Sequence, residues 1–275
     1  MSELKNDAYS PQEISERVKN VGTIKANRDF LSTFVLALLA GAFISFGAVF
    51  FTLVIHDSSL PLGLTKLLGG LVFCLGLILV VIAGAELFTG NNLIVMAYVH
   101  KEITLYKLLR NWVIVYIGNL VGALSMVMWI YLTRQWEGNN FLIGTKALLI
   151  ANAKVNLPFM VALTRGIMCN VLVCLAVWLC FSGRSVTDKI LAIIFPITAF
   201  VALGFEHSVA NMYFIPMGII LKSVPAVVSK VSADLSNLTW LGFAVKNLIP
   251  VTIGNIIGGG VLVAAVYWLI YERKK

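Results

Sequence analysis

Charged residues are scarce in this 275-residue sequence. Asp, Glu, Lys and Arg make up 12% of it and hydrophobic residues 59%, with a mean hydropathy of +0.91. Soluble globular domains carry about 25% charged residues. The composition is that of an integral membrane protein and excludes a single soluble domain. The net charge of +8 is not accompanied by a stacking motif or a basic stripe, so nucleic acid is not expected as a partner.

The sequence also lacks the motifs of metal sites and activated nucleophiles. Its four cysteines lie in apolar segments without a CxxC pair, and neither HExxH nor GxSG occurs. We therefore expect no metal, no cofactor and no enzymatic activity. The alternative from another class is an intramembrane enzyme that uses His207 with Glu206 or Ser208. It is weak because adjacent residues on a helix do not face each other.

Long uncharged runs predict six membrane segments in an all-α fold. An apolar run of about 20 residues can span a bilayer as a helix. The second segment is interrupted by Glu86 and the fifth by Glu206 and His207, so both are predicted to be broken helices. The predicted segments are residues 30–55, 67–99, 111–133, 155–183, 190–221 and 247–271. They form one transmembrane domain, residues 30–271, between an N-terminal arm, residues 1–29, and a short tail, residues 272–275.

Basic residues are distributed unequally between the loops. Of the 21 Lys and Arg residues, 13 fall on the side of the two termini and six on the opposite side. Cytoplasmic loops carry the excess of Lys and Arg. The sequence therefore predicts a multi-pass protein of the inner (cytoplasmic) membrane with both termini in the cytoplasm.

The two halves of the chain repeat each other. Glu86 and Asn91 match Glu206 and Asn211 in spacing, and an asparagine-glycine pattern that begins at Asn111 recurs from position 247. Each half, residues 30–133 and 155–271, holds three predicted segments. Because three is odd, the second half is expected to insert inverted relative to the first.

The breaks have a predicted electrostatic consequence. A helix interrupted inside the membrane exposes backbone groups that need partners, and we expect Glu86 and Glu206 to accept hydrogen bonds from those N–H groups. Asn91 and Asn211 should lie at the start of the half-helices that follow. Both positive N-terminal ends would then point at the centre, an arrangement that attracts anions.

The chain resembles the formate/nitrite transporter family, with the formate channel branch most similar. The stretches that carry the resemblance are Gly84-Ala-Glu-Leu-Phe-Thr-Gly90, Asn111-Trp with Gly118-Asn-Leu-Val-Gly122, residues 165–178, and Gly204-Phe-Glu-His-Ser-Val-Ala-Asn-Met212. The resemblance implies an aquaporin-like fold and a homopentamer with one pore in each protomer. The paired Asn-Pro-Ala motif of aquaporins is absent, which argues against a water channel.

The resemblance also implies roles for particular residues. Thr89 and His207 would meet at the pore centre, and Lys154 would concentrate anions in the outer vestibule. Apolar constrictions would be formed by Phe73, Leu77, Leu87 and Phe200, with Val173 lining one of them. Asn170 and Asn255 are weaker candidates for polar contacts in the pore.

The expected function is a channel or transporter for a small monovalent anion, with formate first and nitrite or hydrosulfide as alternatives. The expected partners are further copies of the chain, the anion and membrane lipid. One hypothesis lets His207 exchange a proton with the solute, because an unperturbed histidine titrates at about pH 6.5. The other keeps His207 as a fixed hydrogen-bond donor.

Overall fold

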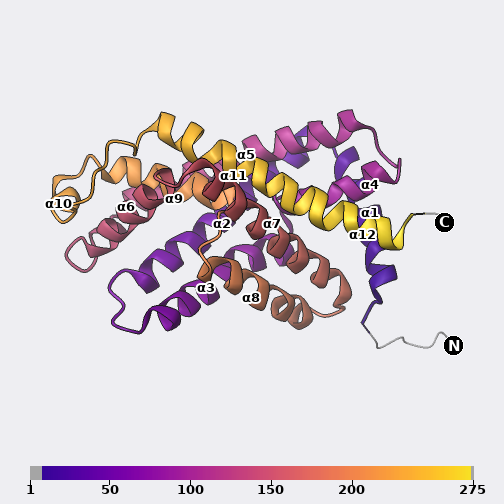
Figure 1. Cartoon of the computed structure of the whole chain (residues 1–275), viewed down its shortest axis with the longest axis horizontal. Coiled ribbons are helices and arrows are strands. Elements are labelled where there is room, and N and C mark those ends of the chain that lie inside the picture. Colours follow the sequence, from indigo (N-terminus) through magenta and orange to yellow (C-terminus); the bar gives the residue numbers. More distant parts are fainter. Residues whose placement is uncertain (1–7, 274–275) are drawn as a thin grey trace.

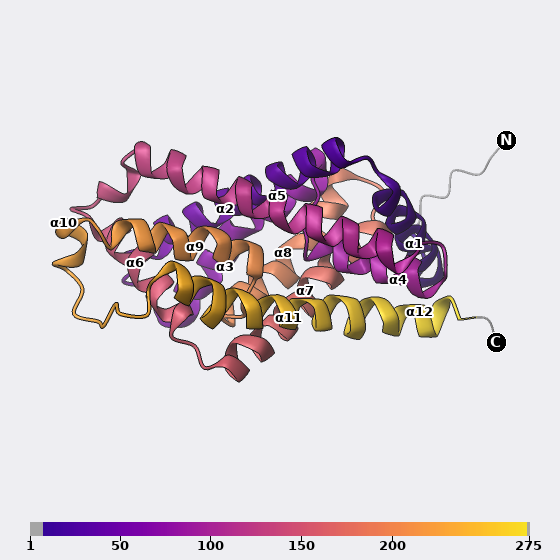
Figure 2. The same ribbon diagram turned by 90° about the horizontal axis from the view of Figure 1, so that it is seen from above.

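The computed structural model describes residues 8–273, and these form helices and loops without a β-strand (Figure 1). The first half contains α1 (Pro11–Asn27), α2 (Phe30–Ile55), α3 (Leu62–Ile78), the π-helical segment η1 (Leu79–Gly84), the 3₁₀ segment η2 (Gly90–Ile94), α4 (Val95–Val99) and α5 (Leu105–Leu132). The second half contains η3 (Gln135–Glu137), α6 (Leu142–Val155), α7 (Phe159–Ser182), α8 (Val186–Ala202), α9 (Ser208–Leu221), α10 (Pro225–Val228), η4 (Gly242–Leu248), α11 (Ile249–Ile256), η5 (Ile257–Ala265) and α12 (Val266–Tyr271). The helices α1 and α12 lie together at one end of the molecule and α10 lies at the other, as both views show (Figures 1 and 2).

Within residues 8–273, five helical segments are long and apolar enough to cross a membrane: Phe30–Ile55, Leu62–Gly84, Leu105–Leu132, Phe159–Ser182 and Gly242–Tyr271. The remaining predicted segment is divided into the shorter helices α8 and α9. Three of the long segments begin five or six residues earlier than predicted, at Leu62, Leu105 and Gly242. The reason is that a lysine or arginine ends an uncharged run without ending the backbone hydrogen bonding of a helix.

Residues 11–27 of the N-terminal arm form the helix α1, which packs on the rest of the chain. Ser10 and Glu13 form a reciprocal capping box at the start of α1, and Pro11 occupies the first turn. Ile14 and Val18 are buried against residues of η2, α4, α7 and η5. The predicted boundary at residue 29 therefore separates two parts that form one packed body, while residues 1–7 and 274–275 lie outside the described residues.

Residues 134–154, for which the sequence predicted no segment, contain the helix α6. Its last turn carries Lys154. Pro158 then starts α7, so that Phe159 and not Val155 is the first residue of the next long helix. The position of α6 ahead of α7 parallels that of α1 ahead of α2.

Both predicted breaks are present. The backbone is non-helical at residues 85–87 and again at 205–207, and helical structure resumes at Gly90 and Ser208. The glycine two residues before each glutamate adopts a left-handed conformation, with φ of 83° at Gly84 and 72° at Gly204. A side chain would strain the backbone there, which explains the glycine at these equivalent positions.

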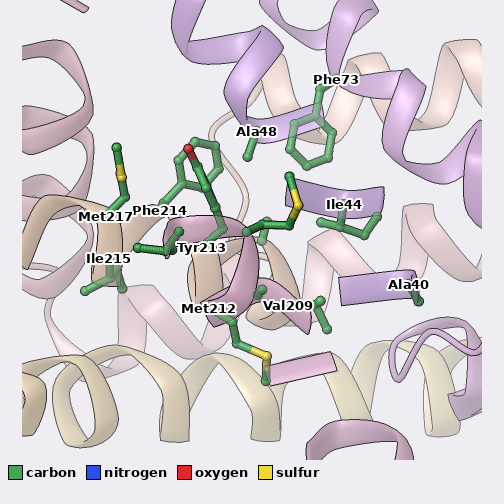
Figure 3. Packing of buried hydrophobic residues seen from close by; sticks show 14 of the residues in the cluster. Ala40, Ile44, Ala48, Phe73, Val209, Met212, Tyr213, Phe214, Ile215 and Met217 are labelled. Atoms are coloured by element: carbon green, nitrogen blue, oxygen red, sulfur yellow. The ribbon is translucent and has the colours of Figure 1, made fainter. Parts of the chain in front are cut away.

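The helix α9 lies at the centre of the fold. Twelve of its 14 residues are buried, and a helix that is apolar on all sides belongs in the interior. It packs against α2, α5 and α6. Figure 3 shows Val209 and Met212 of α9 in one buried cluster with Ile44 and Ala48 of α2.

Small residues permit close packing between the other long helices. A Cβ atom at Gly122 of α5 would overlap the carbonyl oxygen of Leu38 in α2, and one at Gly258 of η5 would overlap that of Ile167 in α7. These two crossings occupy equivalent places in the two halves. They bring the helix backbones into direct contact, as in other membrane helix pairs.

Replacing Gly122 or Gly258 with alanine should therefore destabilise the protein by about 1–3 kcal/mol, the usual cost of overpacking. The shift is measured as a lower thermal unfolding midpoint of the purified protein in detergent. Gly63→Ala is the matched control, since a Cβ atom there meets nothing within 4 Å. Equal midpoints for Gly122→Ala and Gly63→Ala would contradict the packing argument.

Candidate functional site

Thr89 and His207 meet where the two breaks approach each other. The Oγ1 atom of Thr89 lies 2.9 Å from Nε2 of His207, and neither residue is more than 3% exposed. Thr89 follows the first break and His207 ends the second. The contact expected from the resemblance is therefore present.

The hydrogen bonds of His207 define its protonation. Its Nδ1 atom accepts a hydrogen bond of 3.1 Å from the backbone N–H of Ala210, so the side chain caps the N-terminus of α9. A backbone N–H can only donate, and Nδ1 therefore carries no proton. The proton of the neutral ring is on Nε2, which donates to Oγ1 of Thr89.

One of the predicted constriction residues packs directly on this polar pair. The ring of Phe200 stacks on His207 with 5.9 Å between ring centroids, and Phe73 contacts Phe200 edge-on at 5.7 Å. Phe73, Leu77, Leu87, Val173 and Phe200 all belong to one buried hydrophobic cluster. His207 thus lies against this apolar cluster.

A cavity of about 510 Å³ lies on the α1 side of this cluster. Leu77 and Leu87 are among its lining residues, and both are only 2% exposed. Its charged lining residues are Arg17, Lys25, Arg28, Glu86 and Lys189. Four cations therefore face one carboxylate. Sequence reasoning missed this basic cavity, to which α1 contributes Arg17 and Lys25 and the residue after α1 contributes Arg28.

Glu86 is held by one cation of α1 and by the residue that follows this helix. Its carboxylate lies 2.5 Å from Nη1 of Arg28 and 3.2 Å from Nζ of Lys25. The side chain of Asn91 donates to it at 2.7 Å and also to Oδ1 of Asn111 at 3.0 Å. Asn111 in turn donates to the carbonyl oxygen of Lys25.

Glu206 has an equivalent set of partners in the second half. Its carboxylate lies 2.9 Å from Nζ of Lys154 and accepts from Asn211 at 2.7 Å and from Asn247 at 3.2 Å. Asn247 donates to the carbonyl oxygen of Lys154. Lys154 thus occupies the place that Lys25 holds in the first half, while Arg28 has no counterpart among these contacts.

The expectation that the two glutamates accept the freed backbone N–H groups is wrong. The N–H of Phe88 donates to Oδ1 of Asn119 at 2.9 Å, and the N–H of Ser208 donates to Oδ1 of Asn255 at 3.0 Å. A buried carboxylate needs countercharge, and the cations supply it. The neutral amide of an asparagine can bind a donor and an acceptor of the backbone together.

Asn170 and Asn255 support the breaks from within the protein. Asn170 donates to the carbonyl oxygens of Thr89 at 3.3 Å and Asn255 at 2.7 Å. Asn255 donates to the carbonyl oxygens of Gly166 and Glu206. Their amide groups are thus engaged with the backbone of both breaks, which differs from the polar pore contacts expected of them.

Two interrupted helices that meet at a buried polar pair, beside a basic cavity, define a membrane channel or transporter for small anions. The sequence model of the formate/nitrite transporter family matches residues 12–269, and the chain belongs to this family. Its relatives include the formate channel FocA of Escherichia coli K12, 44% identical over 274 residues that cover 98% of this chain and 96% of that protein. FocA of Haemophilus influenzae is 44% identical over 266 residues, 94% of each chain.

Solved structures agree with the family assignment. A pentameric formate channel with formate bound is 45% identical, with a TM-score of 0.82 over 89% of this chain and 98% of that one. An ion channel of the same family, 27% identical, gives a TM-score of 0.79 over 94% and 98% of the two chains. These matches confirm the family that the motifs indicated and the all-helical membrane fold.

The Lys154–Glu206 pair provides a stability test. Lys154→Met or Glu206→Gln should each destabilise the protein by about 3–5 kcal/mol, because each leaves a buried group without its partner. The double variant should recover most of that loss. Thermal unfolding of the original protein, the two single variants and the double variant gives the coupling free energy between Lys154 and Glu206.

Arg134 and Glu137 form the control pair, since the Arg134 side chain is 73% exposed. Exposed pairs contribute about 0–1 kcal/mol, so the matching substitutions should shift the unfolding midpoint little. Additive losses at Lys154 and Glu206 would show that the two groups are not coupled.

Proposed function

We propose that this protein is a homopentameric channel for a small monovalent anion, with formate as the first substrate and one pore in each protomer. The observation that carries the proposal is the buried Thr89–His207 contact between the two breaks, beside a cavity with four cations and one carboxylate. The formate channels among its relatives support the substrate and the pentamer of the solved formate channel supports the assembly.

Anion entry follows from the charges of the cavity. Clusters of one charge sign in a cleft with low-dielectric walls concentrate counterions. Arg17, Lys25, Arg28 and Lys189 provide this field on the α1 side, and Glu86 offsets one of the charges. On the other side we assign the same task to Lys154, although its pairing with Glu206 reduces the net charge there.

Hydrogen-bond donors at the centre of the pore replace part of the water that the anion loses. An unsolvated anion among apolar side chains is strongly unfavourable. The Nε2–H of His207, the hydroxyl of Thr89 and the N-terminal end of α9 are the donors and the positive dipole available there. Phe73, Leu77, Leu87 and Phe200, with Val173 beside them, form the apolar walls on either side.

Proton exchange at His207 would require a second proton on its ring. That proton would occupy Nδ1, which now accepts from Ala210. Protonation would therefore break the hydrogen bond from Ala210 that caps α9. A change in the charge of His207 would in this way alter the first turn of that helix. In the resting structure His207 is a neutral donor. In the proposed step its ring takes up a second proton from water, transfers one proton to formate and returns to the neutral form.

The orientation in the membrane completes the proposal. We place the protein in the inner membrane with both termini in the cytoplasm, in agreement with the common end shared by α1 and α12. The basic cavity then faces the cytoplasm. Nitrite and hydrosulfide are the alternative substrates of the same pore.

The intramembrane enzyme is the weaker proposal because the histidine is already engaged. Thr89 and Ala210 occupy its two ring nitrogens, and the carboxylate of Glu206 is paired with Lys154. A serine nucleophile needs an adjacent free base. We therefore assign no catalytic role to His207, Glu206 or Ser208.

The function is tested in liposomes that contain the purified protein. Formate should enter down its gradient, while potassium flux should stay at the level of protein-free liposomes, because the basic cavity repels cations. Nitrite and hydrosulfide are measured in the same preparation and rank the substrates. Potassium flux comparable to that of formate would contradict the proposal.

The His207→Asn variant tests proton exchange. Asparagine also caps helices well, so the fold and the pentamer should be retained. It cannot exchange a proton near neutrality, and we expect the pH dependence of formate uptake to flatten. Uptake is measured in liposomes between pH 5 and 8 on the basis of the unperturbed histidine pKa of about 6.5.

His56→Asn is the control, since His56 lies outside the pore in the loop after α2 and bonds with Asn139. It should keep the pH profile of the original protein. A His207→Asn variant with an unchanged profile would leave His207 as a fixed donor and refute proton exchange.

A further inference from the structure

A second cavity of about 490 Å³ lies between α5 and the η4–α11 segment, and neither Thr89 nor His207 lines it. Its walls are almost entirely apolar, and they include Val113 of α5 and Ile253 of α11, which are 56% and 43% exposed. It is therefore a groove in the outer surface of two membrane-spanning segments rather than an enclosed void. In this groove a ligand would be bound by apolar contacts.

The floor of the groove is formed by the first break. Phe88, only 3% exposed, lines it and packs edge-on against Tyr116 with 4.9 Å between ring centroids and against Trp112 with 6.0 Å. The hydroxyl groups of Tyr116 and Thr252 satisfy each other at 2.8 Å. The polar atoms at the base are thus paired, and the ligand need not supply hydrogen bonds.

The aromatic residues show which medium covers this face. Tryptophan and tyrosine gather at the two membrane–water interfaces on surfaces that contact lipid. The helix α5 carries exposed Tyr106 near its start, three and seven residues before Leu109 and Val113 of the groove, and exposed Trp240 precedes η4. In contrast, α2, α3, α7 and α8 contain no exposed tryptophan or tyrosine, although they expose many aliphatic side chains and phenylalanines. The face of α5 and η4–α11 therefore contacts lipid, and the other faces are left for neighbouring copies.

Lys107 and Arg110 lie near Leu109, which lines the groove, but their charged ends point to the N-terminal arm. Nζ of Lys107 donates to Oδ1 of Asn27, and Nη1 of Arg110 donates to the carbonyl oxygen of Arg28. The groove thus offers an apolar channel for an acyl chain, and the proposal does not depend on a bound headgroup.

We propose that the groove between α5 and η4–α11 binds one acyl chain of a membrane phospholipid, held against Phe88. The next residue in the chain is Thr89, so the bound chain supports the first break from outside, at the back of the residue that contacts His207. The site is separate from the anion path and does not depend on which anion the protein carries.

The test uses the full-length protein in nanodiscs whose phospholipid carries a photoactivatable diazirine in its acyl chain. After irradiation, labelled positions are mapped by mass spectrometry of peptides. Label should be several-fold enriched at Val113 and Ile253 over Val121 and Leu262, which have comparable exposure, 40% and 47%, but do not line the groove.

Val113→Trp fills the groove and should reduce label at Ile253 to the level of the residues outside it. Val121→Trp, on the same helix, is the matched control and should leave the label at Ile253 unchanged. Label that follows exposure alone, without enrichment in the groove, would refute the site. Disulfide cross-links between protomers through Val113→Cys would also refute it, because a second copy would then cover the groove.

Discussion

The structure depends on one constraint: backbone groups exposed where a helix breaks inside the membrane must find partners within the protein. Each break leaves N–H groups at the start of the helical structure that follows. The side chain of Asn119 accepts a hydrogen bond from the N–H of Phe88, and the side chain of Asn255 accepts one from the N–H of Ser208. The ring of His207 accepts one from the N–H of Ala210. The side chains that allow the helices to stop are thus the ones that fix Thr89 and His207 in position. Loss of these amide contacts would leave backbone groups of each break without their partners.

Buried carboxylates impose the second requirement, and the two halves meet it unequally. Glu86 is paired with Lys25 of α1 and with Arg28, which follows α1, whereas among residues 8–273 Glu206 is paired with Lys154 alone. The difference leaves positive charge in excess on the α1 side, where Arg17 and Lys189 add to it. An arm outside the membrane core therefore contributes to the electrostatics of the pore. The Lys25–Glu86 pair joins α1 to the first break, and the Lys154–Glu206 pair joins α6 to the second break in the same way.

Particular residues show how far sequence reasoning reached. The break positions were predictable because a glutamate in an apolar run and a glycine that permits a left-handed backbone are both local signals, at Gly84 and Glu86 and again at Gly204 and Glu206. The start of α5 at Leu105 was not, because charged residues end a hydropathic run but do not end a helix. The partners of Glu86 were also missed, because Lys25 and Arg28 lie some 60 residues away from it. From the sequence, these two residues indicated only the orientation of the protein in the membrane. Asn119 and Asn255 were visible as repeated residues, but their binding of the backbone depends on how the helices cross.

The sequence by itself determined the membrane setting, the two breaks, the repetition of the halves and the family, because these are encoded in composition, spacing and local backbone preference. Only the tertiary structure decided which partner each buried polar group has. It placed α1 over the first break, turned Nδ1 of His207 toward Ala210 and so put its proton on Nε2, and left an apolar groove behind Phe88. These features are set by distances between segments far apart in the chain, and buried polar groups take the nearest partner that packing provides.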